Sequence, residues 1–352
     1  MTDVAVHLEA AGFCAIAPPQ ILRHYAEHGT PEQRRSALQS IEISERMRAR
    51  RELVGRLNLL AVAPASSTER RSVYDAHHDT SEEDLPGTLV RKEGGPAGQD
   101  ADANAAYDGA GATYTFYKEV FDRESIDGRG MEIISSVHFA QGLDNAFWNG
   151  QQMVYGDGGE LLQKLPESLD VCGHELTHGV TQMTARLQYH AQSGALNESM
   201  SDVMGSLVKQ WKLGQTADQA DWLIGEGTLR PSVKGVALRS MKAPGTAWEG
   251  DQQPANMEDY KPLPMSDDNG GVHLYSGIPN YAFYLAATAI GGHAWEKAGL
   301  VWYVTLTQNL RPDSDFNAAA QATAAVAAER FGEGGTEHKA VTDAWAAVGV
   351  TG

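Results

Sequence analysis

The spacing of apolar residues predicts helices throughout the second half of the chain. Within Asp170–Thr184, the apolar side chains Val171, Leu176, Val180 and Met183 recur at helical intervals. A second helical stretch and four further helices are expected at residues 193–213, 279–291, 293–310, 315–331 and 336–348. The C-terminal half is therefore expected to form a helical lobe.

A different pattern precedes these helices. Met131–Phe139 and Asn145–Tyr155 mix aromatic and β-branched residues between glycine and aspartate turns, which is typical of β-strands. Residues 72–165 are therefore expected to be rich in β-structure. We assign residues 61–168 to a β-rich lobe and residues 169–352 to an α-helical lobe, which makes the fold class α+β.

The first 60 residues differ from the rest of the chain. They are rich in Arg, Glu, Leu and Ile, and they are expected to be helical between about Pro31 and Leu59. The small-residue linker Ala61–Thr68 follows, with arginine clusters on either side. Two interpretations stay open: a helical N-terminal extension, or a pro-segment that proteolysis removes somewhere between residues 50 and 70.

Composition and charge disfavour several functional classes. The 352 residues suffice for two domains, and the formal net charge of −18 disfavours nucleic acid as a partner and suits a self-repelling monomer. The sequence has no run of about 18 apolar residues, so we expect no membrane-spanning segment. Two cysteines, Cys14 and Cys172, allow at most one disulfide. The interrupted apolar N-terminus predicts no signal peptide, so we expect a cytoplasmic protein or one secreted by a non-classical route.

His174-Glu175-Leu176-Thr177-His178 is an HExxH motif within the first predicted helix. Histidines at positions i and i+4 lie on one helix face about 6 Å apart, so both imidazoles can bind one zinc ion. Zinc lowers the pKa of a bound water towards about 7, and the neighbouring Glu175 carboxylate can accept the proton. The alternative is an ordinary amphipathic helix, because the motif arises by chance in roughly a few per cent of chains of this length.

A catalytic zinc ion usually takes three protein ligands and leaves one position for water. Glu198 can supply the third ligand, since Gly194 permits a turn that packs the second predicted helix against the first. Asp202 lies one turn after Glu198 and can accept a hydrogen bond from a histidine ring. We therefore predict a zinc site of His174, His178 and Glu198.

With these residues, the sequence resembles the thermolysin-like neutral metallopeptidases. The resemblance extends from about Tyr74 to Gly349 and rests on five separate motifs in order: Asn145–Asp157, His174–Val180, Gly194–Asp202, Leu238–Met241 and Asp268–His273. It implies a β-rich N-terminal lobe and an α-helical C-terminal lobe with a zinc cleft between them. It also implies an endopeptidase that acts on peptide or protein substrates.

The resemblance assigns catalytic roles to residues in these motifs. Glu175 activates water and then protonates the leaving amine. Tyr189 and His273 stabilise the oxyanion of the transition state, and Asp268 orients His273. Two further residues support the zinc-binding histidines, namely Asp202 and Asn197.

Substrate-binding roles follow in the same way. Asn145 and Ala146 lie on an edge strand that accepts an extended peptide, and Arg239 binds a substrate carbonyl. The side chain after the scissile bond enters a pocket of aliphatic residues, which are Leu162, Leu165, Val171 and Leu238. Substrates with Leu, Ile, Val or Phe at this position are expected to be preferred, since each buried side chain contributes about 1.5–3 kcal/mol.

The N-terminal segment resembles the short pro-region of protealysin-type members of the family. Pro18-Pro19-Gln20-Ile21-Leu22 is similar to the proline-pair motif of that pro-region. We therefore expect residues 1–60 to fold onto the cleft as an intramolecular inhibitor, with Pro18–Leu22 near the zinc. Cys14 either reaches the metal as a thiolate or packs as a structural thiol.

The sequence departs from the family at a double calcium site near the active centre. Aligned through Gly194–Asp202, its ligand positions are Asp170, Lys209, Asp221, Leu223 and Glu226. Lys209 replaces the carboxylate that bridges the two ions, whereas calcium needs about six to eight oxygen ligands. We predict that a lysine–carboxylate cluster replaces the double site, because Lys209 shares a helix face with Glu198 and Asp202. A solvent-directed lysine beside one weakened calcium ion is the alternative.

Two other functional classes fit parts of the sequence. A catalytically silent binding protein with this fold would lack the base or a ligand, and both are present here. A zinc aminopeptidase would need acidic residues that hold a free N-terminus, and the sequence has no motif for them. Several histidines lie outside the motifs and are interpreted as surface or satisfied core residues: His77, His78, His138, His190 and His293. Cys172 is interpreted as a small buried hydrophobic residue.

Overall fold

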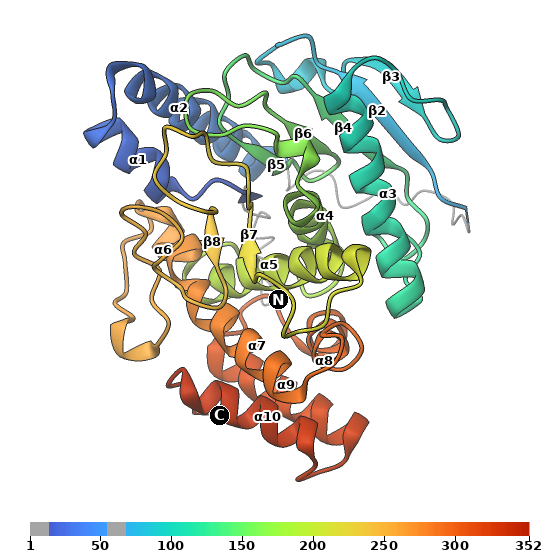
Figure 1. Ribbon diagram of the computed structural model, residues 1–352, viewed down its shortest axis with the longest axis vertical. Helices are drawn as coiled ribbons and strands as arrows, with labels where there is room; N and C mark the ends of the chain where they lie inside the picture. Colours follow the sequence, from blue (N-terminus) through green and yellow to red (C-terminus); the bar gives the residue numbers. More distant parts are fainter. Residues whose placement is uncertain (1–13, 55–67, 352) are drawn as a thin grey trace, which may run out of the picture.

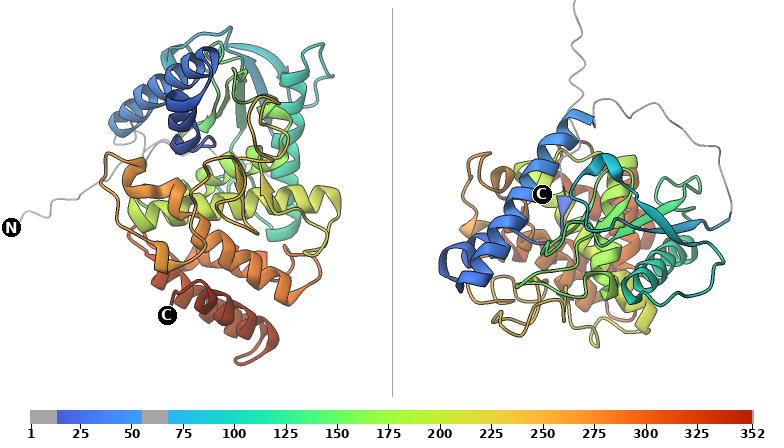
Figure 2. Two further views of the ribbon diagram at one scale, coloured as in Figure 1. Left: turned by 60° about the vertical axis from the view of Figure 1, so that its left-hand side comes forward. Right: turned by 90° about the horizontal axis from the view of Figure 1, so that it is seen from above.

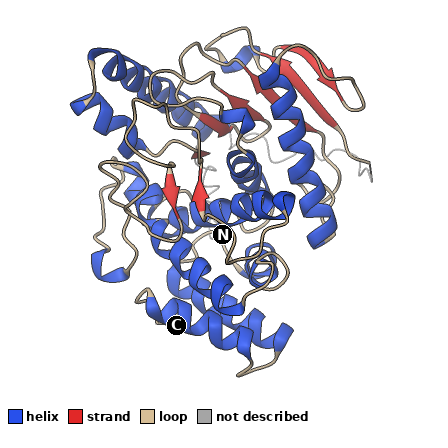
Figure 3. Cartoon of the chain, viewed as in Figure 1, coloured by secondary structure: helices blue, strands red, loops and turns tan. Residues whose placement is uncertain are grey.

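The computed structural model describes residues 14–54 and 68–351, although the side chains of Cys14 and of residues 48–54 lie outside this description. It confirms the expected α+β fold, with a mixed β-sheet in the N-terminal lobe and helices in the C-terminal lobe (Figures 1 and 3). The predicted processing region, residues 50–70, lies largely outside the described residues. The predicted contact of the Cys14 thiolate with zinc lies outside them too.

The N-terminal lobe is built on a six-stranded sheet with the strand order β1-β5-β6-β4-β2-β3. Strands β2, β4 and β6 run parallel to one another, whereas β1 and β6 pair antiparallel with β5, and β3 pairs antiparallel with β2. The strands are β1 (Cys14–Ala15), β2 (Arg71–Asp75), β3 (Thr88–Lys92), β4 (Ile133–Val137), β5 (Ala146–Trp148) and β6 (Met153–Tyr155). The N-terminal strand β1 thus covers the edge of the sheet that β5 would otherwise expose.

A long helix of the N-terminal lobe was not expected from the sequence. Helix α3 (Ala101–Phe121) packs along β2 and β4 and against α4 (Leu169–Met183) (Figure 1). Its tyrosines, threonines and glycines favour strands and turns in isolation, and burial against the sheet overrides that preference. Gly109 permits the close approach to α4, because a Cβ there would lie 3.1 Å from the Cys172 Sγ atom. Cys172 is buried, as expected.

The C-terminal lobe consists of helices and a short two-stranded sheet. Besides α4, its helices are α5 (Ala191–Leu213), α6 (Asp268–Tyr275), α7 (Gly277–Ile290), α8 (Ala298–Val304), α9 (Phe316–Phe331) and α10 (Thr336–Ala347). The small sheet pairs β7 (Leu223–Ile224) with β8 (Arg239–Ser240). The predicted helices are all present, but the one expected at residues 293–310 begins at Ala298 and ends in a π-helical turn, and the irregular α6 was not predicted. No helix in the described part of the chain is long and apolar enough to cross a membrane.

Helices α4 and α5 cross at a point of very close contact. A Cβ on Gly205 of α5 would lie only 2.4 Å from the Asp170 carbonyl oxygen of α4. A larger residue could not be accommodated there without moving the two helices apart. The close crossing brings the HExxH face of α4 against the Glu198 face of α5.

The N-terminal segment packs against both lobes. After β1, Pro18 and Pro19 begin α1 (Pro19–His28), a helix that was not predicted from the sequence, and α2 (Pro31–Val54) follows at the position expected for a helix. Helix α1 buries Ile21, Leu22 and Tyr25 and contacts α6 of the helical lobe. The two helices lie side by side along one side of the molecule (Figure 2).

Candidate active site

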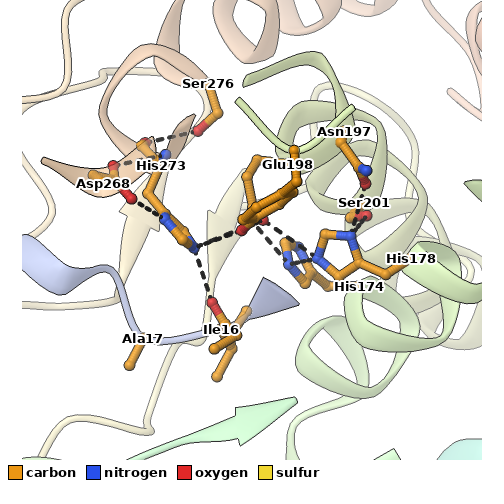
Figure 4. Close-up of polar contacts among 12 residues, drawn as sticks. Ile16, Ala17, His174, His178, Asn197, Glu198, Ser201, Asp268, His273 and Ser276 are labelled. Atoms are coloured by element: carbon orange, nitrogen blue, oxygen red, sulfur yellow. Dashed lines mark hydrogen bonds and ion pairs between the residues drawn. The ribbon is translucent and has the colours of Figure 1, made fainter. Parts of the chain in front are cut away.

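The crossing of α4 and α5 brings His174 and His178 against Glu198 (Figure 4). The two histidine Nε2 atoms lie 2.9 Å apart. The Glu198 carboxylate oxygens lie 3.4 Å from His174 Nε2 and 3.5 Å from His178 Nε2. All three side chains are buried. Two imidazole nitrogens and one carboxylate around a common point are the donor set of a catalytic zinc site.

Hydrogen bonds at the outer ring nitrogens orient both histidines. His174 Nδ1 lies 2.7 Å from Asp202 Oδ1, and His178 Nδ1 lies 2.8 Å from Asn197 Oδ1. Since these oxygen atoms accept the hydrogen bonds, the Nδ1 atoms carry protons and the Nε2 atoms point towards each other.

The residues present fit a zinc ion. Two Nε2 atoms at 2.9 Å need a proton or a metal cation between them. The Glu198 Oε2 atom is also buried and has no hydrogen-bond partner among the described residues. A buried carboxylate oxygen without a donor is costly unless a cation binds it. One zinc ion satisfies all three groups.

Asp202 is held in place by residues of other elements. Arg239 in β8 donates two hydrogen bonds of 2.8 Å to its carboxylate, and Asn280 in α7 donates a third of 2.8 Å. Burial opposes the charge of Asp202, but Arg239 and His174 outweigh it and hold the pKa at about 2. Asp202 is thus a permanent anion that orients His174. Asn280 lies outside the recognised motifs and was not predicted from the sequence.

Glu175 follows the first histidine and extends towards the sheet. Its Oε2 atom accepts a hydrogen bond of 2.8 Å from the backbone N–H of Trp148 in β5. Its Oε1 atom has no hydrogen-bond partner in the described part of the chain. Burial raises the pKa of this carboxyl to about 8. A carboxylate with one oxygen fixed and a pKa near neutrality is suited to general-base catalysis.

Tyr189 and His273 lie on the other side of Glu198. The Tyr189 hydroxyl donates a hydrogen bond to Glu198 and lies 3.2 Å from His273 Nε2. Asp268 lies 2.6 Å from His273 Nδ1 and accepts a second hydrogen bond of 2.9 Å from the His273 backbone N–H. Although burial lowers the pKa of His273, the Glu198 and Asp268 carboxylates raise it above its ordinary value. Both side chains can therefore donate to a developing oxyanion.

The backbone around Asn269 explains how His273 reaches the site. Asn269, Gly270 and Gly271 have φ angles of 49°, 82° and 87° within α6. This left-handed turn favours glycine, which is consistent with the Gly-Gly pair in the sequence. Gln253 further fixes the turn, because its side chain donates a hydrogen bond of 2.6 Å to the His273 carbonyl. Gln253 lies in no sequence motif and was not predicted to support the site.

Residues 15–17 of the chain itself lie along the site (Figure 4). The Ile16 N–H donates to the Ala146 carbonyl at 3.0 Å, and the Ala17 N–H donates to Asn145 Oδ1 at 3.0 Å. Arg239 donates a hydrogen bond of 2.8 Å to the Ile16 carbonyl, and His273 Nε2 lies 3.0 Å from the Ala15 carbonyl oxygen. Each residue predicted to contact substrate backbone, namely Asn145, Ala146 and Arg239, thus contacts the N-terminal segment.

The proline-pair motif is not the part of the segment that reaches the centre of the site. Its Gln20 side chain donates a hydrogen bond of 2.8 Å to Asp268. The contacts with Arg239 and His273, however, come from Ile16 and Ala15, which no sequence motif singled out. The expectation that Pro18–Leu22 lies near the zinc stays a prediction; Pro18 and Pro19 begin α1, and the motif contacts the site through Gln20.

The aliphatic residues predicted to form the substrate pocket are buried. They belong to the same apolar cluster as Ile16, and they are Leu162, Leu165, Val171 and Leu238. Val171 lies on α4, three residues before His174. Their burial fits the aliphatic lining that was expected, and their role in binding a substrate side chain stays a prediction.

Lys209 is directed towards three carboxylates. Its Nζ atom lies 2.7 Å from Asp221, 3.3 Å from Asp170 and 3.5 Å from Glu226. Asp170 is buried, whereas Asp221 is partly exposed and Glu226 is more exposed. Although burial opposes the ammonium charge, Asp170 and Asp221 raise the pKa of Lys209 above its ordinary value. The ammonium group thus lies among the carboxylates, as the sequence predicted. That it takes the place of calcium stays a prediction.

Comparisons with known proteins agree with this geometry. The family model described as "Thermolysin metallopeptidase, catalytic domain" matches residues 64–182, and the one described as "Thermolysin metallopeptidase, alpha-helical domain" matches residues 185–350. An "Extracellular metalloprotease" of Pectobacterium carotovorum subsp. carotovorum is 45% identical over 97% of this chain and 98% of its own length. "Protease PrtS" of Photorhabdus sp. (strain Az29) is 49% identical over 81% of this chain and 77% of its own length.

One solved structure is similar over nearly the whole chain. The precursor of protealysin, a metalloproteinase from Serratia proteamaculans, superposes with a TM-score of 0.84 at 47% sequence identity. The similarity covers 96% of this chain and 100% of that one. It therefore extends over most of the N-terminal segment described above, β1, α1 and α2.

Proposed function

This chain belongs to the thermolysin family of metallopeptidases and is a zinc-dependent endopeptidase, and we propose that its own N-terminal segment inhibits it until that segment is removed. We further propose that the processed enzyme cleaves peptide bonds before hydrophobic residues. The observation that carries both proposals is the register of residues 15–17 against β5.

The proposed mechanism follows from the contacts of the site. His174, His178 and Glu198 would hold the zinc ion, which supplies Lewis acidity when bound. Glu175 accepts a proton from the attacking water and passes it to the leaving amine, since its Oε1 atom is unengaged among the described residues. Tyr189 and His273 donate hydrogen bonds to the developing oxyanion, and loss of one such donor typically costs about 2.7–4 kcal/mol.

The N-terminal segment supports this assignment of the substrate path. A peptide that binds by strand addition to β5 places one carbonyl at His273 and the next at Arg239. In this chain those carbonyls belong to Ala15 and Ile16. The Ala15–Ile16 peptide bond therefore lies where the scissile bond of a substrate is proposed to lie. Ile16 then occupies the position after the scissile bond, where an aliphatic substrate side chain is expected.

Helices α1 and α2 support inhibition because they anchor the segment on both sides of the cleft. Ser36 in α2 donates a hydrogen bond of 2.6 Å to the buried Asp144, which lies directly before Asn145. Asn145 in turn donates to Ser44 at 3.1 Å. On the other side, Arg23 in α1 forms an ion pair with Asp267. A peptide substrate would have to displace residues 15–17 while these contacts hold them in place.

The substitution Ile16→Asp tests the inhibition. Ile16 is fully buried, so an aspartate there loses apolar burial and adds an uncompensated charge, and residues 15–17 should leave the site. We expect the intact precursor carrying Ile16→Asp to cleave an internally quenched, end-blocked peptide at least about 10-fold faster than the unsubstituted precursor, since burial of a charge costs well above about 1.4 kcal/mol. N-terminal mapping has to establish that both chains are still unprocessed.

Leu38→Asp is the matched control, because Leu38 lies in the same segment but is 53% exposed. This variant should remain as inhibited as the unsubstituted precursor. Equal activity of the Ile16→Asp and unsubstituted precursors would contradict the proposed inhibition, as would full activity of an intact unsubstituted chain.

The place of action is proposed from the relatives. One relative is named an extracellular metalloprotease, and we propose that this enzyme also acts outside the cell as a monomer on peptide or protein substrates. The net charge of −18 supports a soluble enzyme without a nucleic-acid partner.

A further inference from the structure

A second cluster of histidine and aspartate side chains lies in the N-terminal lobe, outside the catalytic residues. One ligand atom each from Asp102, His138 and Asp157 lies within 4.8 Å of the others. His78 Nδ1 lies 2.9 Å from Asp157 Oδ2, and Asp100 Oδ2 lies 3.0 Å from His138 Nε2. We propose that Asp102, His138 and Asp157, with His78 beside them, form a second binding site for a divalent transition-metal ion such as zinc.

The topology of the sheet explains why these residues meet. Strands β2, β4 and β6 are parallel, so their carboxyl ends lie at the same edge. His78 follows the end of β2, His138 directly follows β4, and Asp157 comes two residues after β6. This edge of a parallel sheet is where ligands commonly bind in α/β structures.

Helix α3 completes the cluster from the other side. Asp100 is its N-cap and accepts a hydrogen bond of 3.1 Å from the Ala103 N–H, and Asp102 lies in its first turn. The Asp102 carboxylate makes no hydrogen bond or ion pair with any residue that the structure describes, although it is partly buried and burial raises its pKa. Asp102 therefore has carboxylate oxygens available to bind a cation at the cluster.

Charge balance at the cluster also favours a cation. In the described part of the chain, the ion pairs of Asp100 and Asp157 are with His78 and His138, and no lysine or arginine pairs with either. Three aspartates thus face two imidazoles, of which one lies between two carboxylates, at 2.6 Å from Asp157 and 3.0 Å from Asp100. If His138 binds a metal ion through one ring nitrogen, its imidazole is neutral, and the three aspartates leave a negative charge that the cation balances.

The donor set selects the class of metal. Imidazole nitrogen together with carboxylate oxygen suits zinc and neighbouring transition metals, whereas calcium prefers oxygen ligands alone. Zinc ligands lie roughly 3.4 Å from one another in a tetrahedral site, so the side chains would close by on the order of 1 Å on binding. Side chains at the ends of loops and in a first helical turn can make such a movement by rotation about χ angles. The bound ion would link the ends of three strands to α3.

Asp102→Asn is the direct test, because it removes a ligand charge and preserves size. Asp108→Asn is the matched control, since Asp108 lies on the same helix with its side chain 73% exposed. Both variants are compared with the unsubstituted full chain by equilibrium dialysis against buffered zinc, followed by metal analysis. The same three chains carrying His174→Ala isolate the second site, because that substitution disables the catalytic zinc site.

We expect two zinc ions per unsubstituted chain and per Asp108→Asn chain. Asp102→Asn should weaken binding of the second ion at least about 10-fold, since even residues that only support metal ligands change affinity by about 10–100-fold. In the His174→Ala background, zinc should raise the melting temperature of the chain that retains Asp102 but not that of the chain carrying Asp102→Asn. A single zinc ion per unsubstituted chain would overturn the proposal, and so would a second ion that Asp102→Asn leaves unaffected.

Discussion

Helices α4 and α5 contribute residues to two charged clusters, which differ in where their positive charge comes from. At the catalytic cluster, His174, His178 and Glu198 direct nitrogen and oxygen donors at one another. At the second, near the start of α4 and the end of α5, Lys209 supplies the positive charge to Asp170 and to Asp221 and Glu226, which follow α5. The first cluster is incomplete without a cation, whereas the second contains its own.

The difference shows how a single side chain decides whether a cluster of carboxylates needs a metal. Carboxylates that share a site repel one another and need a compensating charge. An ammonium group can provide that charge as a flexible donor of hydrogen bonds, whereas only a metal ion can also act as a Lewis acid. We therefore expect zinc to be essential for catalysis and calcium to be dispensable at Asp170.

The largest effect is expected from Glu175→Gln, which changes the catalytic cluster without removing a ligand. The amide cannot accept a proton, so turnover should fall by about 10²–10⁴-fold while zinc content and folding persist. Peptide cleavage by the processed enzyme, together with metal analysis, measures both. Glu167→Gln, at an exposed position just before α4, should leave turnover unchanged. Near-normal activity of Glu175→Gln would show that another group is the base.

A smaller effect is expected from Lys209→Met, which removes the positive charge of the second cluster. Loss of the ammonium group leaves Asp170, Asp221 and Glu226 uncompensated and should lower the free energy of unfolding by about 1–3 kcal/mol. Added calcium should recover part of this loss in the variant, because the carboxylates can then bind it. Thermal unfolding with and without calcium measures both changes.

Lys212→Met is the control for Lys209→Met, because Lys212 lies on the same helix and is exposed. It should change neither stability nor calcium dependence. If Lys209→Met were as stable as the unsubstituted chain, the lysine would not be the group that neutralises the cluster.

Much of the fold and the centre of the site could be predicted from the sequence, because short-range patterns encode them. The HExxH spacing places two histidines on one helix face, and a second helical pattern carries Glu198. Helix α3 was not predicted because its tyrosines, threonines and glycines resemble a strand until the sheet and α4 are packed against them.

The remaining features depend on contacts between residues far apart in the sequence. Asn280 and Gln253 support the site through single hydrogen bonds to Asp202 and to the His273 carbonyl, and neither lies in a motif. The position of Ile16 at Arg239 depends on how β1 pairs with β5, a register that no local pattern specifies. His138 was interpreted as a surface or satisfied core histidine, and its two ring nitrogens do lie 2.6 Å from Asp157 and 3.0 Å from Asp100. That these residues meet could not be predicted, because the parallel strand ends that carry His138 and Asp157 are separated in sequence.

The central claim is that a zinc ion held by His174, His178 and Glu198 performs the chemistry and that calcium is not needed nearby. The most direct measurement follows cleavage of an end-blocked, internally quenched peptide by the processed enzyme in the presence of a zinc-selective or a calcium-selective chelator. We predict that zinc chelation abolishes cleavage, that added zinc restores it, and that calcium chelation changes neither activity nor melting temperature. Cleavage that survives complete removal of zinc, or a large loss of thermal stability on calcium chelation with zinc in place, would contradict the claim.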